Sequence, residues 1–268
     1  VGSEGTLAYS AAIELKLSPL PTKKIMALCH FSSFYDAMDA AQYLVGLDPV
    51  TVELIDDTMI SLARSIPLFE KTVADFVSGD PSAILVVEFA EETDSDNLAK
   101  ILDLKKTMAE LNGRSKESQY SDAGCVVVLE PAGDQNRISE MRKSGLNIMM
   151  SMKSDTKPVS FVEDCAVPLK DLAEYTQGLT RIFEKHGTSG TWYAHASVGC
   201  LHVRPLLNMK SAADADIMRA IALEAFELVK KYGGSHSGEH GDGISRSEFN
   251  PIMFGTRLTE AFRNLKSI

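Results

Sequence analysis

The chain has 268 residues, of which 44% are hydrophobic, and it carries a formal net charge of −10. This length can bury one large core or two modest ones, and the negative charge argues against nucleic acid or an anionic membrane as a partner. No apolar run approaches the roughly 20 residues that span a bilayer, and the N-terminus lacks a signal-peptide pattern, so we predict a cytoplasmic protein without a transmembrane segment.

Strand-like and helix-like stretches alternate along the chain. Runs of strand length that are rich in Val, Ile and Leu cover residues 24–30, 83–90 and 124–130. Amphipathic stretches with the helical period lie at residues 34–45, 95–112, 132–144, 169–186 and 212–231. The alternation predicts a sheet covered by helices, and the pattern alone favours parallel strands. The sequence shows no internal repeat.

The four cysteines are scattered and form no CxxC pair. We therefore expect reduced, mostly buried thiols and no iron–sulfur ligands at these positions. They are Cys29, Cys125, Cys165 and Cys200.

Two polar segments hold four of the six histidines: YAHASVGCLHVRP at residues 193–205 and GGSHSGEHGDG at residues 233–243. Two histidines and one glutamate are a common ligand set for catalytic zinc, which keeps a fourth position open. His195, His202 and Glu239 fit that description, and His240 would remain free for proton transfer. Histidines beside glycines are also ordinary polar turn residues, so the spacing alone leaves both interpretations open.

The local pattern predicts how these residues could meet. The stretches on either side of residues 197–200 have strand composition, so a hairpin with its tight turn there would bring His195 and His202 together. The glycines of the second segment predict an irregular backbone that passes close to a ligand. Because Glu239 and His240 are neighbours, both can face one site only if the backbone turns between them.

The two segments resemble the signature stretches of the FAD-linked oxidase C-terminal domain, which is found in D-lactate, glycolate and D-2-hydroxyglutarate dehydrogenases of the vanillyl-alcohol oxidase type. The common pattern of that family is HxGDGNLH followed by SxEHGxG. This chain keeps the outer histidines and SGEHGDG but has SVGC in place of GDGN. With the trailing HVRP and the later RSEFN, it is similar to the branch fused to a downstream iron–sulfur domain.

Residues 1–7, VGSEGTL, match the GSEGTL motif that closes the FAD-binding domain in this family. The resemblance implies that residues 1–20 are the C-terminal stub of an FAD-binding domain and that residues 21–268 form a substrate-binding cap domain. It also implies an α+β fold, with a large antiparallel sheet of ferredoxin-like descent covered by helices, in place of the parallel sheet. The residues implied to contact FAD are Gly2, Ser3, Glu4, Gly5 and Thr6.

The resemblance also implies substrate-binding residues. Arg142 and Lys157, in MRKSGLN and TKPVSFVEDCAVP, match an Arg and a Lys that bind the substrate carboxylates in the family's 2-hydroxy acid dehydrogenases. A guanidinium offers a planar fork to a carboxylate, and a lysine adds a mobile charge. Arg204, two residues after His202, would add a third cation if it points inward.

The implied activity is FAD-dependent oxidation of a 2-hydroxy acid to the 2-keto acid. A divalent metal held by His195, His202 and Glu239 would assist it, with zinc as the first choice and iron or manganese as alternatives. His240 would act as general base while a hydride passes to the flavin. We expect the fragment alone to be inactive, most of the FAD surface to belong to the missing domain, and any iron–sulfur cluster to lie outside this chain.

Two other classes of protein remain open from the residues themselves. A zinc-dependent hydrolase could use the same two His, one Glu and spare His, and it would work without flavin. A non-catalytic α+β dimerisation domain could form a homodimer through an exposed sheet edge. Neither class accounts for the GSEGTL stretch.

Overall fold

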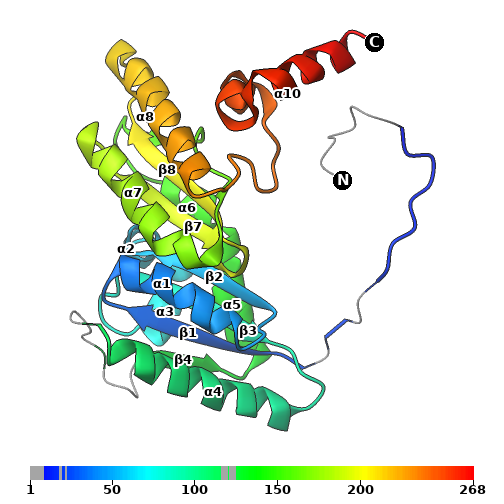
Figure 1. Cartoon of the computed structure of the whole chain (residues 1–268). Helices are drawn as coiled ribbons and strands as arrows, with labels where there is room; N and C mark the ends of the chain where they lie inside the picture. Colours follow the sequence, from blue (N-terminus) through cyan, green and yellow to red (C-terminus); the bar gives the residue numbers. More distant parts are fainter. Residues whose placement is uncertain (1–8, 18–19, 22, 116–119, 121–124) are drawn as a thin grey trace.

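The computed structural model describes residues 9–17, 20–21, 23–115, 120 and 125–268 (Figure 1). Gly2 to Thr6, which carry the predicted FAD contacts, lie outside these described residues. Within the described part of the chain, every helix is too short or too polar to cross a membrane.

The first half of the chain forms a ferredoxin-like unit. Its strands are β1 (Ile25–Phe31), β2 (Thr51–Asp56), β3 (Ala83–Phe89) and β4 (Val126–Leu129). Its helices are α1 (Phe34–Val45), α2 (Asp57–Arg64), α3 (Pro67–Phe76) and α4 (Asp94–Asn112). The strands pair antiparallel in the order β4-β1-β3-β2. This order, with helices between β1 and β2 and between β3 and β4, is the β-α-β-β-α-β arrangement.

Two helices, α5 (Ala132–Lys143) and α6 (Gly145–Met150), lead into the second half. Its strands are β5 (Lys157–Pro158), β6 (Cys165–Ala166), β7 (Gly190–His195) and β8 (Cys200–Leu207). Its helical segments are η1 (Leu169–Asp171), α7 (Leu172–Lys185), η2 (Ala196–Val198), α8 (Ala212–Lys231), α9 (Gly243–Arg246), η3 (Ser247–Phe249) and α10 (Asn250–Lys266).

The second half repeats the topology of the first. β6, α7, β7, β8 and α8 follow one another as β1, α1, β2, β3 and α4 do, and β8 pairs with both β6 and β7. After α8, Ser235 makes an antiparallel bridge to Ala166 of β6, where the first unit has β4 beside β1. The fold therefore contains a repeat that the sequence does not show.

Strands β2 and β7 pair antiparallel and join the two units. The result, among the described residues, is one eight-stranded sheet in the order β4-β1-β3-β2-β7-β8-β5, with β6 also on β8. Every strand pair in it is antiparallel. The α+β prediction is confirmed, and the parallel arrangement that the pattern alone favoured is wrong.

Burial explains why the pattern was misleading. All seven residues of β1 are buried, and six of the seven residues of β3 are, so these strands lack the alternation of a half-exposed antiparallel strand. One face of the sheet packs against α1, α4, α7 and α8 in the larger core. The other face packs against α2, α3, α5 and α6 in a smaller core, over the strands of the first unit. On that second face, β7 and β8 carry polar side chains.

Candidate active site

The predicted hairpin is confirmed by β7 and β8. His195 lies opposite Cys200 and Tyr193 opposite His202, so both histidines project from the same face as diagonal neighbours. Their ring centroids are 5.1 Å apart, at nearly right angles. The turn ends at Gly199, whose φ is +66° and where a Cβ would lie 2.1 Å from the carbonyl oxygen of Val167. The turn that brings the two imidazoles together therefore needs glycine at this position.

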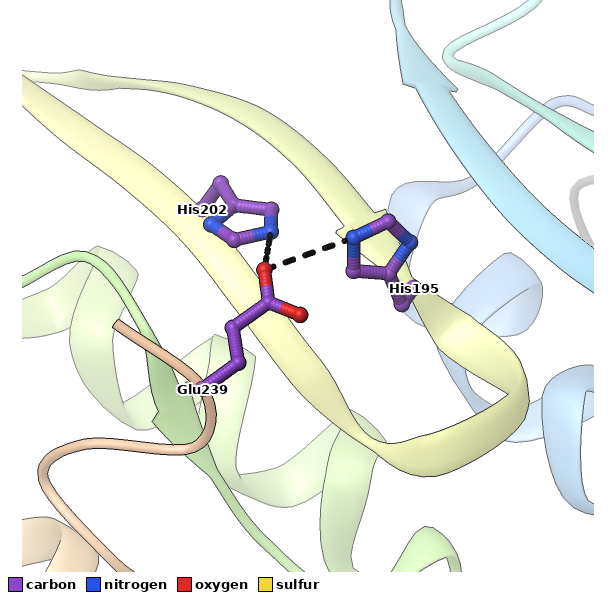
Figure 2. A group of neighbouring side chains, drawn as sticks. All are labelled: His195, His202 and Glu239. Atoms are coloured by element: carbon purple, nitrogen blue, oxygen red, sulfur yellow. Dashed lines mark ion pairs between the residues drawn. The ribbon is translucent and has the colours of Figure 1, made fainter. Parts of the chain in front are cut away.

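Glu239 reaches the two histidines from the glycine-rich segment after α8 (Figure 2). Its Oε1 lies 3.2 Å from Nε2 of His202 and 3.5 Å from Nε2 of His195. One donor atom from each residue lies within 4.8 Å of the other two. The structure thus brings together all three predicted metal ligands from segments far apart in the sequence.

His240 faces the same place. Its Nε2 lies 3.1 Å from Oε1 of Glu239, and its ring stacks on His202 with centroids 5.1 Å apart. The backbone therefore turns between Glu239 and His240, as the proposed roles of both residues require.

Asp164, which the sequence analysis did not single out, holds this turn. Its carboxylate accepts hydrogen bonds from the backbone N–H groups of Glu239 and His240, each at 2.9 Å, and from the Ser237 hydroxyl at 2.8 Å. Burial alone would raise the pKa of Asp164, but the hydrogen bonds from His240 and Ser237 outweigh it and lower the pKa. The carboxylate therefore remains ionised and orders the segment. In the sequence, the one indication of a role for Asp164 is its position within TKPVSFVEDCAVP.

Glu53 of β2 lies behind His195. Both of its carboxylate oxygens are 3.0 Å from Nδ1 of His195, and this hydrogen bond is the main cause of the raised pKa of His195. Arg142, at the end of α5, forms an ion pair with Glu53, and its Nη2 lies 3.3 Å from the same Nδ1. The predicted substrate-binding Arg142 is therefore at the site, but it is already paired. Glu53 was missed because its partners are 89 and 142 residues away.

Arg204 points inward, and its charge is balanced. It donates to Oε2 of Glu163 through Nε at 2.8 Å and to the Tyr193 hydroxyl through Nη2 at 3.1 Å. Burial alone would raise the pKa of Glu163, but hydrogen bonds from Ser160 and Arg204 together lower it. Arg204 thus reaches the site as one half of a buried ion pair.

Lys157 lies elsewhere on the sheet edge. Its Nζ donates to the carbonyl oxygens of Met150 and Met152, at and just after the end of α6. β5 pairs with the far end of β8, at Leu206 and Leu207. Among the described contacts, none joins Lys157 to His202, Glu239 or His240, and its predicted role stays a prediction.

The donor set fits a divalent metal. Burial, followed by the nearby His195, lowers the pKa of His202, which favours the neutral imidazole that can coordinate. A carboxylate hydrogen-bonded to the far nitrogen of a ligand, as Glu53 is to His195, is common at metal sites. Nδ1 of His202 has no such partner among the described residues. Asp164, Glu239 and His240 form a second possible group, but hydrogen bonds already occupy both oxygens of Asp164.

Fold and site together define a duplicated ferredoxin-like domain with a histidine–carboxylate centre on the polar face of its second unit. Residues 20–268 match the family described as "FAD linked oxidases, C-terminal domain". The chain belongs to this family, and the resemblance drawn from the two signature segments is confirmed.

Curated relatives agree with this assignment. The chain is 31% identical over 272 residues to D-2-hydroxyglutarate dehydrogenase of Escherichia coli (strain K12) and 30% identical over 269 residues to that of Pseudomonas putida. Each match covers 99% of this chain and 26% of the relative, so the chain spans about a quarter of their length. It is also 24% identical to the glycolate oxidase subunit GlcD of Bacillus subtilis, over all of this chain and 53% of the relative.

Solved structures show the same fold at low sequence identity. p-Cresol methylhydroxylase with substrate bound superimposes with a TM-score of 0.61 at 13% identity, over 91% of this chain and 50% of that one. The 4-ethylphenol oxidase of Gulosibacter chungangensis superimposes with a TM-score of 0.58 at 11% identity, over 93% of this chain and 52% of that one.

Proposed function

We propose that this chain is the substrate-binding domain of a longer FAD-dependent enzyme that oxidises a 2-hydroxy acid to the 2-keto acid. The convergence of His195, His202, Glu239 and His240 in one cluster carries the proposal. The names of the relatives support the substrate class: D-2-hydroxyglutarate and glycolate, with D-lactate in more distant matches. Residues 1–20 then belong to the preceding FAD-binding domain and residues 21–268 to the substrate domain.

His195, His202 and Glu239 would hold the metal, for which zinc is our first choice and iron or manganese the alternatives. When bound, such an ion supplies Lewis acidity, which lowers the pKa of a hydroxyl group. The flavin of the parent enzyme supplies the hydride acceptor.

The chain's own residues supply orientation and proton transfer. His240 would accept the substrate hydroxyl proton at Nε2, the nitrogen that faces Glu239. Arg142, beside His195, would bind a substrate carboxylate, because a guanidinium can contact Glu53 and a second carboxylate together. In this proposal Lys157 and Arg204 provide the remaining positive charge.

The proposal extends to the parent protein. The FAD-binding domain would hold most of the flavin surface, so we expect the isolated chain neither to retain flavin tightly nor to turn over. The SVGC and HVRP features favour a parent that also has an iron–sulfur domain outside this chain. We place that parent in the cytoplasm.

Elemental analysis of the purified chain tests the metal site. We expect close to one zinc, iron or manganese per chain, and loss of that metal from the His195→Ala, His202→Ala double variant. His186→Ala is the matched control. His186 belongs to neither group of possible metal ligands and is paired instead with Glu224 on α8. Absence of metal from the unmodified chain would contradict the metal assignment.

Activity of the parent flavoprotein tests the reaction. We expect 2-hydroxy acids to reduce its flavin, and His240→Asn to slow this reduction by about 100-fold or more, the usual contribution of a general base. Hydrolytic activity of the isolated chain without flavin would instead support the zinc-dependent hydrolase.

A further inference from the structure

Two arginine–glutamate–histidine chains converge on the cluster. In the first, Arg142 pairs with Glu53, and Glu53 contacts Nδ1 of the predicted ligand His195. The second has the same order. Arg204 binds Oε2 of Glu163, and Oε1 of Glu163 lies 3.7 Å from Nδ1 of His240.

We propose that Glu163 is the positioning residue of His240: its Oε1 accepts a hydrogen bond from the Nδ1–H group, so that the proton stays on Nδ1 and Nε2 is left as the basic nitrogen. This inference rests on the proposed function for what His240 does, but the contact itself does not depend on the reaction. Nε2 lies 3.1 Å from Oε1 of Glu239, which would also accept a hydrogen bond from a protonated nitrogen. In the metal-loaded site this oxygen would be a ligand of the ion, which leaves Glu163 as the acceptor that decides the tautomer.

The physical reason lies in imidazole chemistry. A neutral imidazole carries one proton, and the hydrogen bond made by one nitrogen decides which tautomer is present. A buried carboxylate that holds the outer nitrogen keeps the reactive nitrogen unprotonated and correctly aimed, as in serine protease triads. The distance of 3.7 Å exceeds that of a hydrogen bond, and catalytic hydrogen bonds are often long before a ligand is bound, so the test uses the zinc-loaded site.

Glu163 has the environment that this task needs. Its side chain is 11% exposed and that of Arg204 is 8% exposed, so a full carboxylate charge is balanced by a guanidinium away from water. Because Arg204 binds Oε2, the other oxygen is directed toward His240. The pairing therefore both stabilises the charge of Glu163 and orients its carboxylate.

The backbone places Glu163 and its neighbour Asp164 on the same segment. In an extended strand, adjacent side chains point to opposite sides. Asp164 has φ of +74°, a conformation that non-glycine residues rarely adopt, and this turn lets both carboxylates face residues 237–240. Asp164 binds the backbone N–H of His240 and Glu163 faces its ring. Two consecutive residues thus fix the backbone and the side chain of the same histidine.

The first test is nitrogen NMR of the zinc-loaded chain with isotope-labelled histidine, at a pH where His240 is neutral. The His240 signals are assigned by their loss in His240→Asn. We expect His240 to be protonated at Nδ1, and this preference to be lost in Glu163→Gln. Glu224→Gln, which removes the carboxylate beside His186, should change the His186 signals alone. A His240 tautomer that is protonated at Nε2, or one unaffected by Glu163→Gln, would overturn the proposal.

The second test separates positioning from simple charge balance in the parent flavoprotein. We expect Glu163→Gln to lower kcat about 10- to 100-fold with KM changed less than about twofold, as for other residues behind a functional group. In the Arg204→Met background we expect Glu163→Gln still to lower kcat, but by a smaller factor, because Glu163 keeps its contact with His240 and loses the guanidinium that orients it. If Glu163 serves only as the counter-ion of Arg204, Glu163→Gln will leave kcat unchanged in the Arg204→Met background.

The two tests also distinguish the inference from the function on which it rests. A parent enzyme that does not oxidise 2-hydroxy acids, with a His240 tautomer that depends on Glu163, would overturn the proposed function and leave the contact established. An active parent whose His240 tautomer and kcat both ignore Glu163 would overturn the inference alone.

Discussion

Both carboxylate oxygens of Glu53 lie 3.0 Å from Nδ1 of His195, across the pairing of β2 with β7. These strands occupy equivalent places in the two ferredoxin-like units. The first unit therefore supplies the carboxylate that orients a predicted metal ligand of the second. The strand pairing that joins the two units is also what completes the site.

Replacing Glu53 should weaken metal binding. We expect Glu53→Gln to lower zinc affinity about 10- to 100-fold, because the ring of His195 loses the carboxylate that orients it. The measurement is competitive titration with a chromophoric chelator. Glu88→Gln is the control, since Glu88 lies on the neighbouring strand β3 and is paired with Lys24, just before β1. Equal zinc affinities for Glu53→Gln and the unmodified chain would show that Glu53 does not support the ligand.

Gly199 and Gly187 form a matched pair for the hairpin turn. Both have positive φ, but an added Cβ would lie 2.1 Å from the carbonyl oxygen of Val167 at Gly199 and would meet nothing within 4 Å at Gly187. We expect Gly187→Ala to lower the free energy of unfolding by about 1 kcal/mol, from backbone strain alone. Gly199→Ala should lower the free energy of unfolding by clearly more than Gly187→Ala does, and it should reduce the metal content of the chain. Denaturant unfolding measures the free energy of unfolding of both variants, and equal losses would contradict the steric explanation.

Removing the Asp164 carboxylate should release the turn at residues 237–240. We expect Asp164→Ala to lower the free energy of unfolding by about 3 kcal/mol or more, because two backbone N–H groups, a hydroxyl and the nearby Arg246 lose a buried charged partner. Asp155→Ala is the control, since it removes only an exposed pair with Lys210. Similar unfolding free energies for the two variants would refute this role.

Asp56 should make stability fall as pH rises. Burial raises the pKa of Asp56 to about 7, while its carboxylate accepts hydrogen bonds from the N–H groups of Met59 and Trp192. Since the unfolded chain loses this proton near pH 4, the folded state binds more protons between about pH 4 and 7. The free energy of unfolding should therefore lose up to about 4 kcal/mol across this window.

The contribution of Asp56 is isolated by comparison with Asp56→Asn. The unmodified chain should lose stability relative to this variant as pH rises from about 4 to about 7. The aspartate loses its proton at a higher pH in the folded chain than in the unfolded chain, whereas the asparagine does not titrate. Urea unfolding at a series of pH values measures the difference. A constant difference across the range would show that Asp56 has the same pKa folded and unfolded.

Much of the site could be predicted from local sequence. The hairpin between His195 and His202 follows from strand composition on both sides of a turn with glycine, and the SGEHGDG segment identified Glu239 and His240. The longer amphipathic helices α1, α4, α5, α7 and α8 and the apolar strands β1, β3 and β4 were also predicted near their observed positions, whereas α2, α3 and α10 were not predicted. Local propensity and hydrophobic period suffice for such features because they depend on residues close together in the chain.

Strand direction and the partners of the site depended on tertiary structure. The apolar strands β1 and β3 are covered by helices on both faces, so their sequences resemble parallel strands although they pair antiparallel. Glu53, Glu163 and Asp164 approach the cluster from 142, 77 and 76 residues away. Nothing in the sequence around Glu53 marks it, and Glu163 and Asp164 are marked only by lying within TKPVSFVEDCAVP. The packing of distant strands decides which charges meet.

The sequence by itself thus determined the family, the hairpin and the four residues at the centre of the cluster, since these reside in two short segments. The tertiary structure alone decided that the domain is a duplicated unit and that glutamates lie behind His195 and His240. Pairing energies between remote charged groups depend on burial and distance in space. Neither quantity is a property of the local sequence.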